Sequence, residues 1–238
     1  MSAYGEIKRA IAAAPLPSTV WTPSKDEDLE TNQHISIHHL TLASARALSG
    51  FLEYLGVIFS KEVEDGLTYP QEGEMSQTTF EAYFFAADVF VGIVGLSSPR
   101  TATTLAVVGD PAPLDIQTAR GKRSWEECIA GYYYIKPNYP GRSSHICNAG
   151  FVVPPVHRGK GYGSLLAKSY IHYGPRLGYQ ASVFNLVYVN NLASVRLWEN
   201  LGFTKTGRIP RAGRLRTKDG QGEEYIDAWV IYKSFIEE

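Results

Sequence analysis

A short glycine-rich stretch in the second half of the chain has the composition of a phosphate-binding turn. It follows the apolar run Gly150 to Val153 and reads His157-Arg158-Gly159-Lys160-Gly161-Tyr162-Gly163. We expect a strand, a turn and then a helix that begins near Gly161. N–H groups at a helix N-terminus and the helix dipole attract anions. Alternate glycines let the backbone approach a ligand closely, and Arg158 and Lys160 add positive charge. The pattern predicts a phosphate or pyrophosphate site.

Two common phosphate loops fit this stretch poorly. The mononucleotide loop needs Lys-Ser or Lys-Thr after a four-residue gap, which is absent here. In the dinucleotide loop an acidic residue lies about twenty positions further on, where this chain has the uncharged Asn185. Taken alone, the turn leaves its ligand open.

Few metal-ligating, nucleophilic or titratable side chains lie near this stretch in the sequence. No His, Cys, Asp and Glu cluster has the spacing of metal ligands, and Cys128 and Cys147 are too few for a structural zinc site, so we expect no metal. A Ser-His-Asp signature is also missing. His145 is the one nearby histidine that could titrate near neutral pH, although a surface or core-edge position explains it better. Lys136 and Tyr139 could line a pocket or lie on a solvated loop.

Length, composition and charge of the whole chain limit the class of protein to which it can belong. Its 238 residues suit one domain, and 44% of them are hydrophobic. The net charge of −1 argues against nucleic-acid and anionic-membrane partners, which require a broad basic surface. The sequence has two cysteines, no signal-peptide pattern and no apolar stretch of transmembrane length. We expect a reduced, cytoplasmic protein.

The elements that must position the turn follow from hydrophobic periodicity. We expect an N-terminal arm over 1–30 and one domain over 31–238, with a surface insertion at 96–125, where Ser, Thr, Pro and Gly are frequent. The pattern predicts an α/β (α+β) domain with a central, mostly antiparallel mixed sheet flanked by helices. The expected strands are 33–40, 87–94, 128–135, 148–153, 182–188, 204–209 and 225–232, and the expected helices are 44–58, 76–83, 163–177 and 192–200.

Two segments together resemble one superfamily. The turn matches the loop Gln/Arg-x-x-Gly-x-Gly/Ala of the GNAT N-acetyltransferases, which holds the pyrophosphate of coenzyme A. The segment Asn191 to Phe203 resembles their closing helix motif, Asn-x-x-Ala-x-x-Leu-Tyr-Glu-Lys-x-Gly-Phe. An amphipathic helix with a glycine cap explains the second segment alone, but not the combination. The resemblance implies the GNAT fold and acetyl-CoA as cofactor.

Shorter blocks are similar to a narrower fungal branch, the enzymes that acetylate azetidine-2-carboxylate and cis-4-hydroxyproline. These blocks are Gly66 to Gln71, Tyr134 to Tyr139, Ser144 to Phe151 and Phe184 to Val189. This resemblance implies a small imino-acid substrate and a homodimer. The implied catalytic residues are Asn148 and Asn185, and the implied substrate-binding residues are Asn148, Phe151, Asn185, Leu186 and Asn191. The implied cofactor-binding residues are Phe151, Val152, Val153, Arg158, Gly159, Lys160, Gly161, Tyr162, Gly163 and Asn191.

The chain also departs from the superfamily pattern. Trp198 stands where many members have a tyrosine that protonates the leaving thiolate, and an indole N–H is far too weak an acid for that. No carboxylate occupies the strand positions of the usual general base; asparagines stand there, which orient a ligand but take up no proton. Three functions therefore stay open: acetylation of an imino acid, acetylation of another amine such as a protein lysine or a polyamine, and silent binding of coenzyme A. A polycationic acceptor needs an acidic groove, and no acidic cluster is visible near Asn148 or Asn185.

Overall fold

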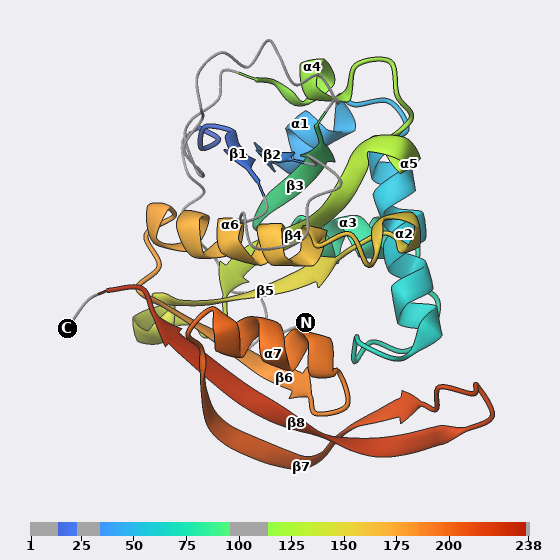
Figure 1. Cartoon of the computed structure of the whole chain (residues 1–238), viewed down its shortest axis with the longest axis vertical. Helices are drawn as coiled ribbons and strands as arrows, with labels where there is room; N and C mark the ends of the chain where they lie inside the picture. Colours follow the sequence, from blue (N-terminus) through green and yellow to red (C-terminus); the bar gives the residue numbers. More distant parts are fainter. Residues whose placement is uncertain (1–13, 23–33, 96–113, 237–238) are drawn as a thin grey trace.

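One eight-stranded sheet organises the protein in a computed structural model that describes residues 14–22, 34–95 and 114–236 (Figure 1). The strand order is β1-β2-β3-β4-β5-β6-β8-β7, and every neighbouring pair is antiparallel except β5 and β6. The predicted mixed, mostly antiparallel sheet is thus confirmed. The strands are β1 (Thr19–Trp21), β2 (Ile35–Leu40), β3 (Asp88–Val94), β4 (Ile129–Pro137), β5 (Ile146–Val152), β6 (Ala181–Tyr188), β7 (Thr204–Arg216) and β8 (Glu223–Ser234).

Helices cover both faces of the sheet. Figure 1 shows α6 and α7 crossing one face and the β7–β8 hairpin at one end of the molecule. The helices are α1 (Leu42–Arg46), α2 (Phe51–Asp65), α3 (Gln77–Phe84), α4 (Ile116–Arg120), α5 (Trp125–Cys128), α6 (Tyr162–Arg176) and α7 (Leu192–Asn200), with short 3-10 turns at Gly141–Ser143 and Pro155–His157.

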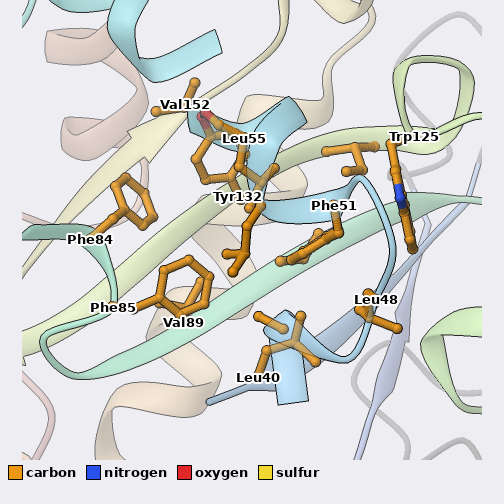
Figure 2. Packing of buried hydrophobic residues seen from close by; sticks show 14 of the residues in the cluster. Leu40, Leu48, Phe51, Leu55, Phe84, Phe85, Val89, Trp125, Tyr132 and Val152 are labelled. Atoms are coloured by element: carbon orange, nitrogen blue, oxygen red, sulfur yellow. The ribbon is translucent and has the colours of Figure 1, made fainter. Parts of the chain in front are cut away.

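The two faces have separate cores because side chains of a strand alternate between faces. Tyr132 and Tyr134 of β4 belong to the core beneath α2 and α3, where Phe51 and Phe84 are fully buried (Figure 2). Tyr133 and its neighbours belong to the core beneath α6 and α7. Complete burial of a large apolar side chain stabilises the fold by about 1.5–3 kcal/mol. The sheet is therefore anchored on both sides and can hold side chains precisely at its interior strands.

The parallel pair β5–β6 is the exception within the sheet. Its register holds only Ile146↔Ala181 and Cys147↔Ser182, although both strands continue beyond these pairs. From there β5 stays paired with β4, and β6 stays paired with β8. We call the opening between Asn148–Val152 of β5 and Val183–Tyr188 of β6 the fork.

Most predicted elements are found near their expected positions, and three regions differ. The helix expected at 44–58 is two helices, because Gly50 adopts the left-handed conformation with φ 71° between α1 and α2. In the expected insertion, 96–113 lies outside the described residues; the remainder forms α4 and the start of α5, capped by Asp115 and Ser124. Of the expected arm, 1–13 and 23–30 lie outside the described residues, while Thr19–Trp21 pairs with β2.

The described helices are all too short or too polar to cross a membrane.

Candidate active site

The glycine turn leads into α6 as the sequence predicts. Gly161 is the N-cap of α6, and both Gly159 and Gly161 have positive φ, 75° and 77°. A methyl group placed on Gly159, Gly161 or Gly163 would meet no atom within 4 Å. The space beside the turn is thus open, and the first turn of a helix offers N–H groups without acceptors inside the helix. The geometry suits an anion held by backbone groups.

Charged side chains at the turn are themselves held in place. Arg158 forms an ion pair with Glu62 of α2, and its Nε donates to the Val153 carbonyl at 3.1 Å. His157 is buried; its Nε2 donates to the Glu126 carbonyl at 3.0 Å, and its Nδ1 lies 3.4 Å from the ammonium of Lys160. These contacts fix the position of the His157 ring within the turn.

A cavity of about 360 Å³ runs from the turn towards the fork. Phe151 and Val153 line it, whereas the side chain of Val152 is buried in the opposite core. Of these three, Val152 could therefore offer a ligand only backbone atoms. Asn191 also lines the cavity, and its Oδ1 accepts the Ser194 N–H at 3.2 Å, so it caps α7 as well. The complete lining is Glu62, Asp65, Leu67, Thr68, Phe151, Val153, Arg158, Asn191 and Ser194.

Three asparagines meet at the closed end of the fork. Asn138 Oδ1 accepts from Nδ2 of Asn148 and from Nδ2 of Asn185, each at 2.6 Å, and Asn138 Nδ2 donates to Asn185 Oδ1 at 3.2 Å. An amide nitrogen carries two hydrogens, so each donor keeps one that these bonds do not use. We call Asn138, Asn148 and Asn185 the asparagine cluster. It can offer a ligand both hydrogen-bond donors and acceptors without any charge.

Asn138 belongs to the asparagine cluster, although the sequence did not single it out as a candidate site residue. Its side chain is 5% exposed, and its N–H donates to the Ile146 carbonyl at 2.8 Å. The one sequence feature that could have indicated Asn138 is its place at the end of a strand, ten positions before Asn148. Asn185 and Leu186 are exposed because the register of β6 shifts between Phe184 and Val187.

Tyrosine side chains form the wall of the fork on the α2–α3 face. The Tyr69 hydroxyl donates to the Phe151 carbonyl at 3.0 Å, and the hydroxyls of Tyr83 and Tyr134 lie 3.0 Å apart. Burial raises the pKa of all three, so the hydroxyls stay neutral donors near pH 7. A methyl group on Gly150 would lie 2.7 Å from the Tyr134 ring, so glycine is what lets this ring lie against β5.

Lys136 lies on strand β4 rather than on the loop where it was expected. Its Nζ is 4.2 Å from the ring centroid of Tyr83 and 4.1 Å from that of Tyr134. Burial lowers the pKa of Lys136 to about 8.

A second cavity, of about 670 Å³, lies between the end of α2, the loop before α3 and the β7–β8 hairpin. Gln71 Oε1 and the Tyr188 hydroxyl line it, and neither buried atom has a hydrogen-bond partner within the described residues. Four glutamates and two arginines also line it: Glu64, Glu72, Glu74, Glu223, Arg214 and Arg216. The fold thus gathers an acidic lining that the sequence did not indicate, because the glutamates come from distant segments.

Several residues considered from the sequence lie apart from the fork. His145 is exposed, and its Nδ1 donates to the Arg142 carbonyl at 3.2 Å. The basic residues of β7 also form exposed ion pairs, Arg208 with Asp227 and Lys205 with Glu199. Trp198 is 5% exposed and packs on Phe184 with 4.6 Å between ring centroids, so it fills the apolar core.

Comparison with known proteins gives a consistent family. Residues 113–203 match the model of the "Acetyltransferase (GNAT) family". N-acetyltransferase aca1 of Schizosaccharomyces pombe is 42% identical over 184 residues, which span 77% of this chain and 80% of that protein.

Solved structures share the fold at lower identity. A GCN5-related N-acetyltransferase from Kribbella flavida superposes with a TM-score of 0.58 at 22% identity, over 84% of this chain and 97% of that one. The acetyltransferase yncA of Salmonella typhimurium, whose structure contains acetyl-CoA, gives a TM-score of 0.57 at 18% identity, over 86% and 95% of the two chains.

Proposed function

This chain belongs to the acetyltransferase (GNAT) family, and from that premise we propose that it transfers an acetyl group from acetyl-CoA to the amine of a small cyclic imino acid. Azetidine-2-carboxylate, cis-4-hydroxyproline or a related proline analogue is the acceptor. The observation that carries the proposal is the asparagine cluster at the fork. Its amides can donate to a carboxylate and accept from an amine, which suits a small zwitterion.

The residues of the donor side fit a long, phosphate-bearing cofactor. The open space beside Gly159, Gly161 and Gly163 accommodates a pyrophosphate, and the cavity from Arg158 to Phe151 has room for an extended arm. Phe151, Val153 and Asn191 would hold that arm. Acetyl-CoA held there would supply an activated thioester: the C–N bond to the amine would form as the C–S bond breaks, and coenzyme A would leave as a thiolate that takes up the proton still on the nitrogen, directly or through water.

The fork also has backbone groups that could stabilise negative charge on a carbonyl oxygen. Beyond Cys147, β5 has no paired β6 residue among the strand pairs that the structure describes. N–H groups of β5 that point towards β6 are therefore available to a ligand. Donors of this kind, fixed in advance, typically contribute several kcal/mol to acyl transfer.

Proton transfer must differ from that of members with a carboxylate base. Among the described hydrogen bonds, the asparagine cluster has no carboxylate partner. An asparagine cannot take up a proton, so the amine must lose its proton to water before attack. The role of the cluster is to orient the amine and its lone pair towards the carbonyl carbon.

Thiol release with a panel of amines tests the proposal. We expect release with azetidine-2-carboxylate and cis-4-hydroxyproline, and little release with spermidine or a lysine peptide. Release with the cationic amines alone would contradict the proposed acceptor. Binding of coenzyme A without any release would instead identify a silent binding module.

A cationic amine is the second candidate acceptor, because of the 670 Å³ cavity. Arg214 is paired with Glu72 and Glu223, at 3.1 Å in both cases, which leaves Glu64 and Glu74 opposite Arg216 in the lining. An acidic cavity attracts amines of positive charge. Spermidine and the lysine peptide in the panel represent this class.

We also propose that the protein is a homodimer. In support, β7 is an edge strand of 13 residues, and long edges readily pair with a second chain. Light scattering coupled to size-exclusion chromatography should give twice the mass of the chain, and a monomeric mass would contradict the proposal.

A further inference from the structure

Lys136 lies beside the asparagine cluster, and the family resemblance gives this residue no role. It is the register partner of Asn148 across β4 and β5, and it precedes Asn138 by two positions. Alternate residues of a strand share a face, so Lys136 lies on the same face as Tyr134. Its ammonium lies between the rings of Tyr83 and Tyr134, 4.2 and 4.1 Å from their centroids.

The positive charge of Lys136 has no counter-ion in the described protein. No Asp or Glu of the described residues forms an ion pair with it, in contrast to Lys205 or Arg214. Burial is the one cause that lowers its pKa, to about 8, so it is mostly protonated at neutral pH. The ring faces attract a cation, but they do not neutralise its charge. A partly buried charge without a partner is costly, which points to a partner that arrives with a ligand.

The rings around Lys136 reach towards the two places where an acceptor could bind, the fork and the 670 Å³ cavity. The Tyr83 ring stacks on Phe59, and Phe59 also packs against Tyr69, which lines the 670 Å³ cavity. The Tyr134 ring lies against Gly150, which belongs to the fork. The two rings that contact the Lys136 ammonium thus connect it with the fork and with the residues around the cavity.

We propose that Lys136 binds the carboxylate of the acceptor and thereby selects amino and imino acids over amines that lack a carboxylate. This inference rests on the proposed function, because it assumes an amine acceptor at the fork. In an α-imino acid one carbon separates the carboxylate from the nitrogen. A carboxylate at Lys136 therefore keeps the nitrogen beside the asparagine cluster, where the amides orient it.

The test compares two acceptors that differ only in charge, azetidine-2-carboxylate and its carboxamide. Wild type should prefer the carboxylate in kcat/KM. Lys136→Met keeps the length of the side chain and removes the charge; it should lower that preference by about 30-fold, mainly through KM, as expected when a hydrogen bond to a charged group is lost. Lys136→Arg should restore most of the preference, and Lys61→Met, on the exposed side of α2, should match wild type.

Equilibrium binding keeps this inference separate from the proposed function. Calorimetry with coenzyme A present should show tighter binding of the carboxylate than of the carboxamide to wild type, and a lost difference in Lys136→Met. That result supports the inference even if no acetylation occurs. If Lys136→Met lowered kcat/KM and affinity equally for the carboxylate and the carboxamide, the inference would be overturned, because a structural or proton-transfer role of Lys136 would affect both acceptors alike. An unchanged preference in Lys136→Met, with acetylation intact, would overturn it while the proposed function stands.

Discussion

The two sides of the fork are built in different ways. The proposed donor side is one continuous stretch, the turn from Arg158 to Gly163 with the start of α6, and it offers mainly backbone groups. The proposed acceptor side draws side chains from five separate elements: Tyr69 from the loop before α3, Tyr83 from α3, Lys136 and Asn138 from β4 and its end, Asn148 from β5, and Asn185 from β6.

The difference teaches where each kind of change should act. A site made of backbone tolerates most side-chain replacements and fails when bulk or strain enters the turn. A site made of side chains fails when one hydrogen-bond partner is removed, because the others are left buried and unsatisfied. Four predictions test this contrast.

The largest effect is expected at the centre of the acceptor side. Asn138→Ala removes the acceptor of both Asn148 and Asn185, so we expect kcat/KM for the imino acid to fall by about 100-fold. Asn148→Ala and Asn185→Ala should each lower turnover strongly as well. The fold should survive, as checked by circular dichroism and thermal unfolding.

Asn200→Ala, at the exposed end of α7, is the matched control and should leave the kinetics unchanged. Wild-type rates in the purified Asn148 and Asn185 variants would remove the asparagine cluster from the mechanism.

The second prediction concerns stability, and it separates function from structure at Lys136. The folded pKa of about 8 is below the unfolded value of 10.5, so the unfolded chain binds more protons between these values and stability rises with pH across that window. Below pH 8 the folded protein carries the full free-energy cost of burying the charged ammonium. Lys136→Met should therefore be more stable than wild type at pH 7 by about 1–3 kcal/mol, or roughly 2–8 °C in Tm.

Thermal unfolding of both proteins at pH 7 and at pH 9.5 measures this gain, which should shrink at the higher pH. A less stable variant at pH 7 would mean that the ring contacts with Tyr83 and Tyr134 outweigh the burial of the charge.

The third prediction concerns the donor side. Gly161→Ala adds a methyl group at the N-cap of α6, where φ is 77° and no protein atom lies within 4 Å. The left-handed conformation disfavours alanine, so stability should fall by about 1–2 kcal/mol, and the affinity for acetyl-CoA should fall by about 10-fold because the methyl group occupies ligand space. Calorimetric titration with coenzyme A measures the loss. Unchanged affinity would show that the ligand does not approach this turn.

The smallest effect is expected at the wall of the fork. Tyr69→Phe removes the hydroxyl that donates to the Phe151 carbonyl, which should lower kcat by about 3- to 5-fold and stability by about 1 kcal/mol. Tyr54→Phe is a suitable control, because the buried Tyr54 hydroxyl has no partner within the described residues. Loss of the Tyr54 hydroxyl should therefore leave the free energy of unfolding unchanged. Equal effects of the two changes would mean that the Tyr69 bond is unimportant.

The donor side could be predicted from sequence because its determinants are local. The glycines, the helix that follows them and the Asn191 cap of α7 lie within short stretches of chain. The break before α2 was missed because the hydrophobic period continues across it, whereas α1 ends at Arg46 and the left-handed Gly50 caps the start of α2.

The acceptor side could be predicted only in part, because it depends on strand pairing. Asn138 reaches Asn185 across 47 positions, which no local pattern indicates. Lys136 was expected on a loop because the predicted strand ends at Ile135. The pairing of β3 ends at Ile135, so Pro137 faces no β3 residue that needs its missing N–H, and β4 continues alongside β5.

The two residue pairs that join β5 to β6 also have a consequence for folding. Backbone hydrogen bonds couple the strands β1 to β5 and, separately, β6, β8 and β7, while aromatic packing such as that of Phe151 against Phe184 and Trp198 bridges the opening. We therefore expect native-state hydrogen exchange to show two cooperative units with different opening free energies. A ligand bound in the fork touches both units, so its binding should merge the two exchange phases into one.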